Sequence, residues 1–152
     1  MILVSGNSNN WPAKWFTPEE IIKKSQYGTF IMNEKLEDTL YVVDIIREII
    51  GQPVYITDAC RFTGSETSQH FFKAPFNALD IWTPGYSSAD LIKILEEHDL
   101  GTGRGLYPYG NGFIHVDCRR GKSSKEGRVS RWYRDQNGVY HSCGPDYDGL
   151  LE

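Results

Sequence analysis

The sequence predicts an α+β fold, in which a small antiparallel sheet is flanked by helices. Apolar residues recur near the helical period in residues 33–50, and an alternating strand pattern follows at once in residues 53–58. Further on, an Asn-Gly pair separates two strand-like stretches, residues 129–135 and 139–142, and this pair favours the tight turn of a hairpin. At 152 residues the chain fits a single domain.

Cap residues mark the predicted helices in the first third of the chain. A short helix over residues 17–26 begins with Thr17 as its cap, and Glu20 completes a capping box. The longer helix of residues 33–50 ends at Gly51, because glycine readily adopts the left-handed conformation that terminates helices. Both helices therefore precede the first predicted strand.

Two later strands separate polar from apolar side chains. In residues 78–82 the apolar neighbours of Asp80 point to the core, so that Asp80 faces the other way. In residues 112–117 the same alternation places His115 and Asp117 away from the core. Both strands can therefore project polar groups from one side of the sheet.

A helix and a loop are predicted between these two strands. Ser87 or Ser88 caps a helix that continues to about His98. Three closely spaced glycines then predict an irregular loop: Gly101, Gly103 and Gly105.

Composition and charge exclude several classes of protein. The net charge is −4 and the sequence pI is about 5.6, so a general nucleic-acid-binding surface is not indicated. The basic residues near the C-terminus are expected to form a solvated face: Lys122, Lys125, Arg128, Arg131 and Arg134. Three cysteines are an odd number and predict free thiols.

No signal peptide and no membrane-spanning run are recognisable, so synthesis in the cytosol and a soluble protein without a membrane partner are expected. We expect residues 1–15 to form an N-terminal arm and residues 16–152 to form one domain, as a monomer.

His70, Asp80 and His115 are the candidate metal ligands. Two imidazoles and one carboxylate leave zinc a fourth position for water or substrate. A water in that position is acidified and becomes a nucleophile near neutral pH. Taken alone, a histidine like His70 is more often an ordinary surface residue, and one like His115 in an apolar strand is more often a hydrogen-bonded structural residue. Their joint occurrence with Asp80 favours the metal site.

The spacing of these residues resembles a known family. Ser68-x-His70, Ala78-x-Asp80-Ile81 and Phe113-Ile-His115-Val-Asp117 are similar to motifs of the zinc D-Ala-D-Ala carboxypeptidases, peptidase family M15, in the subgroup with a Phe-Ile-His-Val-Asp motif. The resemblance extends over residues 16–132 and includes the stretch from Gly101 to Tyr107-Pro108. It implies a D-Ala-D-Ala carboxypeptidase/Hedgehog-like fold and one Zn²⁺ held by His70, Asp80 and His115.

The same resemblance implies roles for other residues. Arg61 would hold the substrate, with a structural ion pair as its alternative, and Ser68 and Tyr107 would contact the substrate or pack as ordinary loop residues. Asp117 would orient His115 by accepting its second ring proton. His141 is a reserve ligand.

Two departures from the family pattern concern catalysis. Nine residues separate His70 from Asp80, where six are usual, and Gly112 stands where many members carry the carboxylate general base. Glu66 is the carboxylate proposed in its place, with Asp58 less favoured.

The resemblance implies a zinc metallopeptidase that acts on peptidoglycan stem peptides at the bacterial cell wall, as a D-Ala-type carboxypeptidase or an endolysin-like endopeptidase, encoded by a phage or a bacterium. The alternative is an inactive zinc-containing domain that binds the wall or has a structural role, and Gly112 favours it.

Overall fold

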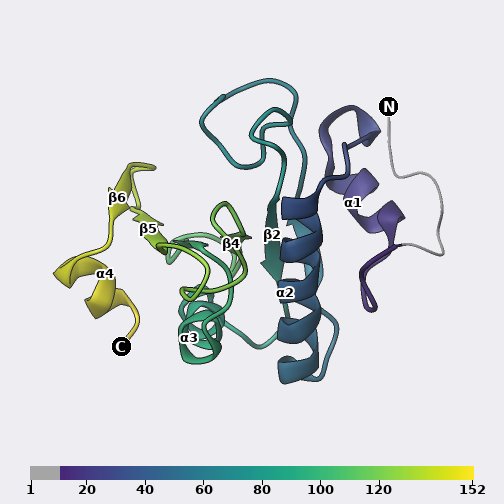
Figure 1. The fold of residues 1–152 in the computed structure, drawn as a ribbon. Helices are drawn as coiled ribbons and strands as arrows, with labels where there is room; N and C mark the ends of the chain where they lie inside the picture. Colours follow the sequence, from purple (N-terminus) through teal and green to yellow (C-terminus); the bar gives the residue numbers. More distant parts are fainter. Residues whose placement is uncertain (1–10) are drawn as a thin grey trace.

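The computed structural model describes residues 11–152 and shows an α+β fold built on one six-stranded sheet (Figure 1). The strand order is β1-β2-β4-β3-β5-β6. The strands are β1 (Tyr55–Asp58), β2 (Ala78–Trp82), β3 (Gly103–Leu106), β4 (Ile114–Asp117), β5 (Ser130–Arg134) and β6 (Tyr140–Ser142). Neighbouring strands are antiparallel except β3 and β5, which are parallel. The predicted fold class is confirmed.

Two helices cover the central strands on one face of the sheet. The helices are α1 (Pro18–Lys24), the 3-10 helix η2 (Gln26–Gly28), α2 (Glu34–Ile50), α3 (Ser88–His98) and α4 (Pro145–Leu150). Helix α2 contacts β2 and β4, α3 contacts β3 and β4, and α1 lies beside the edge strand β1 (Figure 1). The core between α2, α3 and the sheet contains the buried strand residues Leu79, Ile81, Ile114 and Val116. The opposite face of β2 and β4 is left for polar side chains.

The predicted helix boundaries are confirmed by their capping groups. Thr17 and Glu20 form the reciprocal capping box of α1, and the side chain of Asn33 accepts the N–H of Leu36 at the start of α2. Gly51 ends α2 with a φ of 75°, in the left-handed region. Ser87 caps α3. These boundaries are set by local hydrogen bonds, which is why the sequence alone locates them.

The predicted loop at residues 101–105 is wrong, because strand β3 begins at Gly103 and pairs with β4 on one side and β5 on the other. Its glycines lie opposite large groups on neighbouring strands. A Cβ atom on Gly103 would overlap the carboxylate of Asp117, and one on Gly105 would lie 2.7 Å from the Trp132 ring. These glycines therefore make space for neighbouring side chains and do not interrupt the strand.

The predicted N-terminal arm lies partly outside the described residues, since residues 1–10 are not described. Trp11 packs edge-on against Phe30 at 6.3 Å and donates a hydrogen bond to the carbonyl of Phe16. The Trp15 ring is partly exposed and lies under the guanidinium of Arg47, 4.2 Å from the ring centre. Residues 11–16 are thus packed against the helices.

The three cysteine thiols are free, with Cys60 and Cys118 buried and Cys143 exposed. Within residues 11–152, no helix combines the length and the apolar character needed to cross a membrane.

Candidate metal centre

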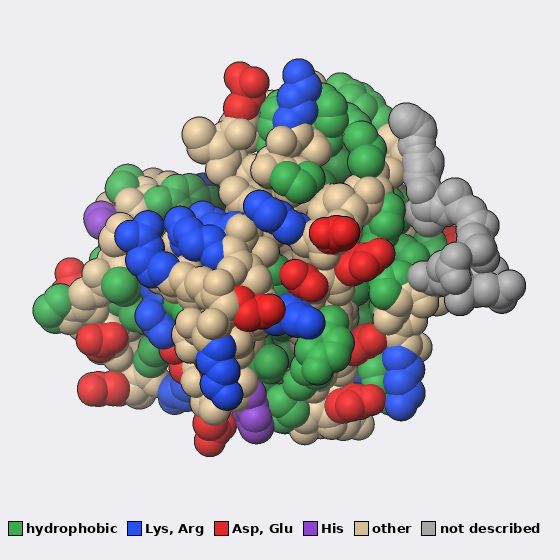
Figure 2. Space-filling view, in the orientation of Figure 1, with side chains coloured by type: hydrophobic (Ala, Val, Ile, Leu, Met, Phe, Trp, Pro, Cys, Tyr) green, Lys and Arg blue, Asp and Glu red, His purple; other side chains and the backbone are tan. Residues whose placement is uncertain are grey.

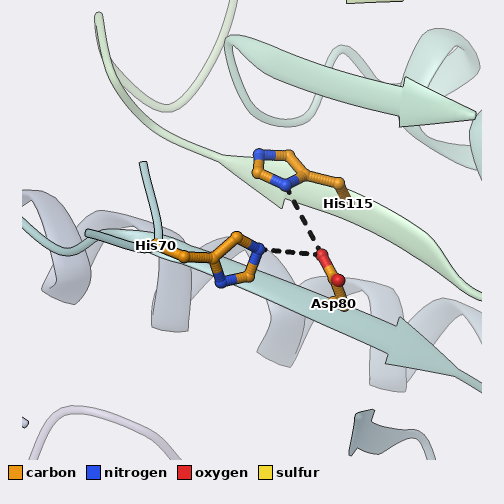
Figure 3. Close-up of side chains that lie close together, drawn as sticks. All are labelled: His70, Asp80 and His115. Atoms are coloured by element: carbon orange, nitrogen blue, oxygen red, sulfur yellow. Dashed lines mark hydrogen bonds and ion pairs between the residues drawn. The ribbon is translucent and has the colours of Figure 1, made fainter. Parts of the chain in front are cut away.

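His70, Asp80 and His115 meet on the face of the sheet opposite α2. Asp80 in β2 and His115 in β4 are direct cross-strand partners, so their side chains leave the sheet on the same side. His70 reaches them from the loop between β1 and β2, and the three side chains point toward one another (Figure 3). Their potential ligand atoms all lie within 4.8 Å of one another, and all three residues are buried.

Backbone contacts fix the position of His70. The carbonyl of His70 accepts the N–H of Arg61 at 2.8 Å, and its own N–H donates to the hydroxyl of Ser68 at 3.1 Å. Its ring Nδ1 lies 2.7 Å from the carbonyl oxygen of Ala59. Because a carbonyl can only accept, Nδ1 carries the proton and Nε2 is left with a free lone pair, 3.0 Å from Asp80 Oδ1.

The loop that carries His70 also accommodates the wider spacing to Asp80. Phe71 and Phe76 bury their rings, and the Ala74–Pro75 peptide bond is cis. The Asn77 amide donates to Pro75 O and Gln69 Oε1 and accepts the N–H of Cys118 at the end of β4. The additional residues between His70 and Asp80 therefore pack into the protein and do not displace the ligands.

Asp117 fixes the orientation of His115. The ring Nε2 of His115 lies 2.6 Å from Asp117 Oδ2, so Nε2 donates, and Nδ1 lies 3.4 Å from Asp80 Oδ1. Asp117 is fully buried and also accepts hydrogen bonds from the backbone and guanidinium of Arg119. A carboxylate on the distal nitrogen is the usual partner of a metal-bound histidine.

These contacts direct one ring nitrogen of each histidine and the carboxylate of Asp80 at one region. Burial raises the pKa of Asp80, but the imidazoles of His70 and His115 outweigh it and hold that pKa below its usual range. Burial opposes the charged form of His115, but the hydrogen bonds to Asp117 and Asp80 raise its pKa to about 9. In the absence of a metal, Nδ1 therefore shares a proton with Asp80, and a bound metal ion would replace that proton. The group therefore attracts a cation, and its nitrogen and carboxylate donors fit zinc.

Trp132 in β5 forms a wall beside the centre. The Trp132 ring packs edge-on against the His115 ring, with 4.8 Å between the ring centres. The guanidinium of Arg119 lies over the Trp132 ring, 5.1 Å from its centre. The absent side chain of Gly105 provides the space for this ring. The sequence analysis did not identify Trp132, since only the pairing of β3 with β5 brings it to His115.

A cleft of about 560 Å³ opens next to Asp80. Its lining residues are Thr57, Asp58, Arg61, Asp80, Trp82, Tyr107, Asn111, Phe113, Arg134 and Tyr140. Of the predicted site residues, Arg61 and Tyr107 therefore lie beside the centre. Glu66 is exposed in the turn before His70 and, like Ser68 and Asp117, is not among the lining residues.

Arg61 forms an ion pair with Asp58 across the floor of this cleft. The register between β1 and β2 shifts between Ile56 and Asp58, so that Asp58 lies opposite Asp80. Such an irregularity re-aims side chains next to a site. Arg61 therefore has both the structural partner and the cleft position that the sequence suggested as alternatives.

Tyr107 presents its phenol to the same cleft, with its ring stacked on Phe113 at 4.5 Å. Burial raises the pKa of Tyr107, and the negative charge of Asp80 and the neighbouring Tyr140 raise it further. The hydroxyl therefore stays protonated at neutral pH.

Gly112 has a φ of 87°, which side chains rarely adopt, in the turn before β4. A Cβ atom there would lie 3.1 Å from the Trp82 ring. A carboxylate side chain at this position would require both backbone strain and movement of Trp82.

His141, the reserve ligand, lies apart from the centre. It is exposed on β6, stacks on Tyr133 at 4.9 Å, and pairs with Asp135 at 2.8 Å.

A buried centre of two histidines and a carboxylate beside an open cleft defines the class of metal-dependent hydrolases. The family model described as Peptidase M15 matches residues 14–117, and the chain belongs to peptidase family M15, whose members are zinc-dependent. Together the family and the centre support a zinc peptidase. Searches of curated proteins and of solved structures found no match. The matched segment ends at the last residue of β4, so hairpin β5–β6 and α4 lie beyond it.

Proposed function

We propose that this protein is a zinc metallopeptidase that hydrolyses peptide bonds in bacterial peptidoglycan, as a D-Ala-type carboxypeptidase or an endolysin-like endopeptidase. One observation carries the proposal. Each histidine of the centre has one ring nitrogen committed to a protein oxygen, so that the other nitrogen and Asp80 face a common region next to the cleft. His70, Asp80 and His115 would hold one zinc ion, which when bound supplies an acidified water and polarises the peptide carbonyl.

Arg61 and Tyr107 are suited to binding the reacting peptide. The hydroxyl of Tyr107 can donate a hydrogen bond to the oxygen on which negative charge develops, and the Arg61 guanidinium can bind a peptide carbonyl or carboxylate. Asp117 orients His115 and is shielded from the cleft, so its role is positioning. The Ser68 hydroxyl accepts a hydrogen bond from the His70 N–H. Ser68 would in addition contact the substrate.

Proton transfer is assigned to a carboxylate outside the ligand set. Glu66 is the residue put forward by the sequence, and it would act only if the turn before His70 carries it to the substrate. Asp58 already lines the cleft opposite Asp80, although Arg61 and the Ala59 N–H occupy its oxygens. Comparing Glu66→Gln with Asp58→Asn separates the two candidates. The variant that lacks the proton-carrying residue should lose most of the kcat of the wild type, while its zinc content should be unchanged.

The peptidoglycan substrate and the action at the cell wall rest on the resemblance to D-Ala-D-Ala carboxypeptidases. An enzyme that is encoded by a phage or associated with a virion would be brought to the bacterial cell wall, where this substrate lies.

The proposal is tested by digesting purified peptidoglycan with zinc-loaded protein and identifying the released muropeptides by mass spectrometry. The wild type should bind about one zinc and release peptides, while His70→Ala should do neither. His141→Ala is the matched control, because it removes an exposed histidine outside the centre. Digestion that persists in metal-free protein would refute the proposal.

A second candidate is an inactive zinc-containing domain that binds the wall. Gly112 favours it, since the turn there carries no carboxylate. Co-sedimentation with sacculi, without release of any muropeptide, would identify this function in place of hydrolysis.

A further inference from the structure

One wall of the cleft comes from the hairpin β5–β6, beyond the segment that matches the family. Arg134 in β5 and Tyr140 in β6 are cross-strand partners, and both line the cleft. The Arg134 guanidinium lies 5.8 Å from the centre of the Tyr140 ring, and this ring packs edge-on against Tyr107 at 6.3 Å. The hairpin therefore brings a cation to the same cleft as Tyr107 and Asp80.

The two arginines of the cleft differ in how their charge is balanced. Arg61 is neutralised by its ion pair with Asp58. Within residues 11–152, no carboxylate pairs with Arg134, whose Nε lies 3.4 Å from the carbonyl of Gly138. Its neighbour Asp135 is engaged with His141 and with backbone N–H groups of the hairpin turn. Arg134 thus presents an uncompensated positive charge to the cleft.

The surroundings of Arg134 favour an anion. Figure 2 shows Lys and Arg side chains gathered on the side of the molecule where Figure 1 places β5, although the chain as a whole has a net charge of −4. The guanidinium lies over the Tyr140 ring and its Nε donates to the Gly138 carbonyl, so the terminal N–H groups are the ones that can bind a ligand. A planar guanidinium offers two parallel donors that match the two oxygens of a carboxylate.

We propose that Arg134 binds a carboxylate of the peptide substrate and so determines which peptides the enzyme cleaves. This inference rests on the proposed peptidase function. A stem peptide offers two sources of that carboxylate, the C-terminal α-carboxylate and the α-carboxylate of its γ-linked D-glutamate. Both present the same group to Arg134, so matched peptides must distinguish them.

The test compares zinc-loaded wild type with Arg134→Gln on three peptides: a stem pentapeptide ending in D-Ala-D-Ala, its C-terminal amide, and the peptide in which the D-glutamate carboxylate is an amide. Loss of a charge-assisted hydrogen bond should raise KM about 10- to 100-fold for the first peptide, with kcat within about twofold. Arg134→Lys should restore part of the affinity. Arg128→Gln is the matched control, because Arg128 is an exposed arginine that does not line the cleft.

The source of the carboxylate follows from which amide abolishes the effect of Arg134→Gln. Binding of the same peptides to metal-free protein, measured by calorimetry, gives a readout that does not depend on turnover. If wild type binds the pentapeptide through Arg134 but cleaves none of the peptides, the peptidase function fails, and only the binding of a peptide carboxylate by Arg134 stands. If Arg134→Gln behaves like Arg128→Gln in KM and in binding for every peptide, or if wild type binds none of them, this inference is wrong.

Discussion

Arg104 in β3 and His115 in β4 lie on adjacent strands but on opposite faces of the sheet, and each is the centre of a buried charged cluster. Arg104 is the register partner of Val116, a core residue, whereas His115 is the partner of Gly105. Arg104 is buried but its partners Glu96 and Asp99 are partly exposed, whereas His70, Asp80 and His115 are all buried. The two clusters also differ in where their donor and acceptor atoms are directed.

In the Arg104 cluster every charged group has a partner. Arg104 donates to the carbonyls of Leu100 and Gly101 and to the carboxylates of Glu96 and Asp99. Glu96 also accepts two hydrogen bonds from Arg131. This cluster ties α3 to β3 and β5 and needs no further ion.

At the candidate metal centre, three potential ligand atoms are directed at one region. His70 and His115 spend their ring protons on Ala59 and Asp117, and both remaining nitrogens face Asp80. Burial and charge occur in both clusters, so neither identifies a functional site. What distinguishes the candidate metal centre is the convergence of two ring nitrogens and a carboxylate next to a cleft.

The largest expected effect tests this convergence directly. Asp80→Asn keeps the shape of the side chain but removes its charge, so we expect zinc to be lost and peptide hydrolysis to fall by at least about 10³-fold. Zinc is measured by elemental mass spectrometry and hydrolysis by muropeptide release. Full zinc occupancy in Asp80→Asn would contradict the assignment of this ligand.

Arg104→Met should have the converse result, with lower stability and unchanged zinc content. Removing one partner of a buried ion pair costs about 3–5 kcal/mol, and we expect about 2–3 kcal/mol here because Glu96 keeps Arg131 and Asp99 is partly exposed. Urea unfolding measures the loss. A variant that is as stable as wild type would show that this cluster contributes nothing to folding.

Asp117→Asn should weaken zinc binding about 10- to 100-fold without removing a ligand, because a neutral amide polarises the His115 ring less than a carboxylate. Competition with a chelator of known affinity measures the change. Arg120→Gln, which removes an exposed arginine near the same turn, serves as the control and should leave the affinity unchanged.

The smallest expected effect is the pH dependence that arises from Asp99. Hydrogen bonds from Ser124, followed by Arg104, lower the pKa of Asp99 to about 2, below its unfolded value of about 3.9. Its stabilisation should therefore be complete above about pH 5 and be lost as pH falls toward 2. Asp99→Asn should be less stable than wild type by no more than about 1 kcal/mol at pH 7, and the difference should vanish near pH 2. Unfolding curves over this range test it.

The sequence predicts those parts of the fold that are specified locally. Helix α2 and the hairpin β5–β6 follow from periodicity, caps and an Asn-Gly turn, and the strand alternation places Asp80 and His115 on one face. Strand β3 was predicted as a loop, because its glycines are explained only by side chains from other strands. Helix α4 was not predicted, since it is short and has no clear apolar period.

The candidate metal centre, like the fold, was predicted only in part from the sequence. Motif spacing identified its three candidate ligands, and strand parity placed Asp117 beside His115. The carbonyl of Ala59 has no sequence signature, because any residue supplies one. Trp132 and Arg134 reach the centre and the cleft through the parallel pairing of β3 with β5, which no local pattern encodes.

Gly105 has a consequence for anyone who alters this protein. The Trp132 ring fills the space above this glycine and presses on His115, so a single methyl group at position 105 would act on the centre from a residue that touches no ligand. Mutational scanning would then report an inert residue as intolerant. In a redesign of the cleft wall, a larger residue at position 105 has to be combined with a smaller residue in place of Trp132.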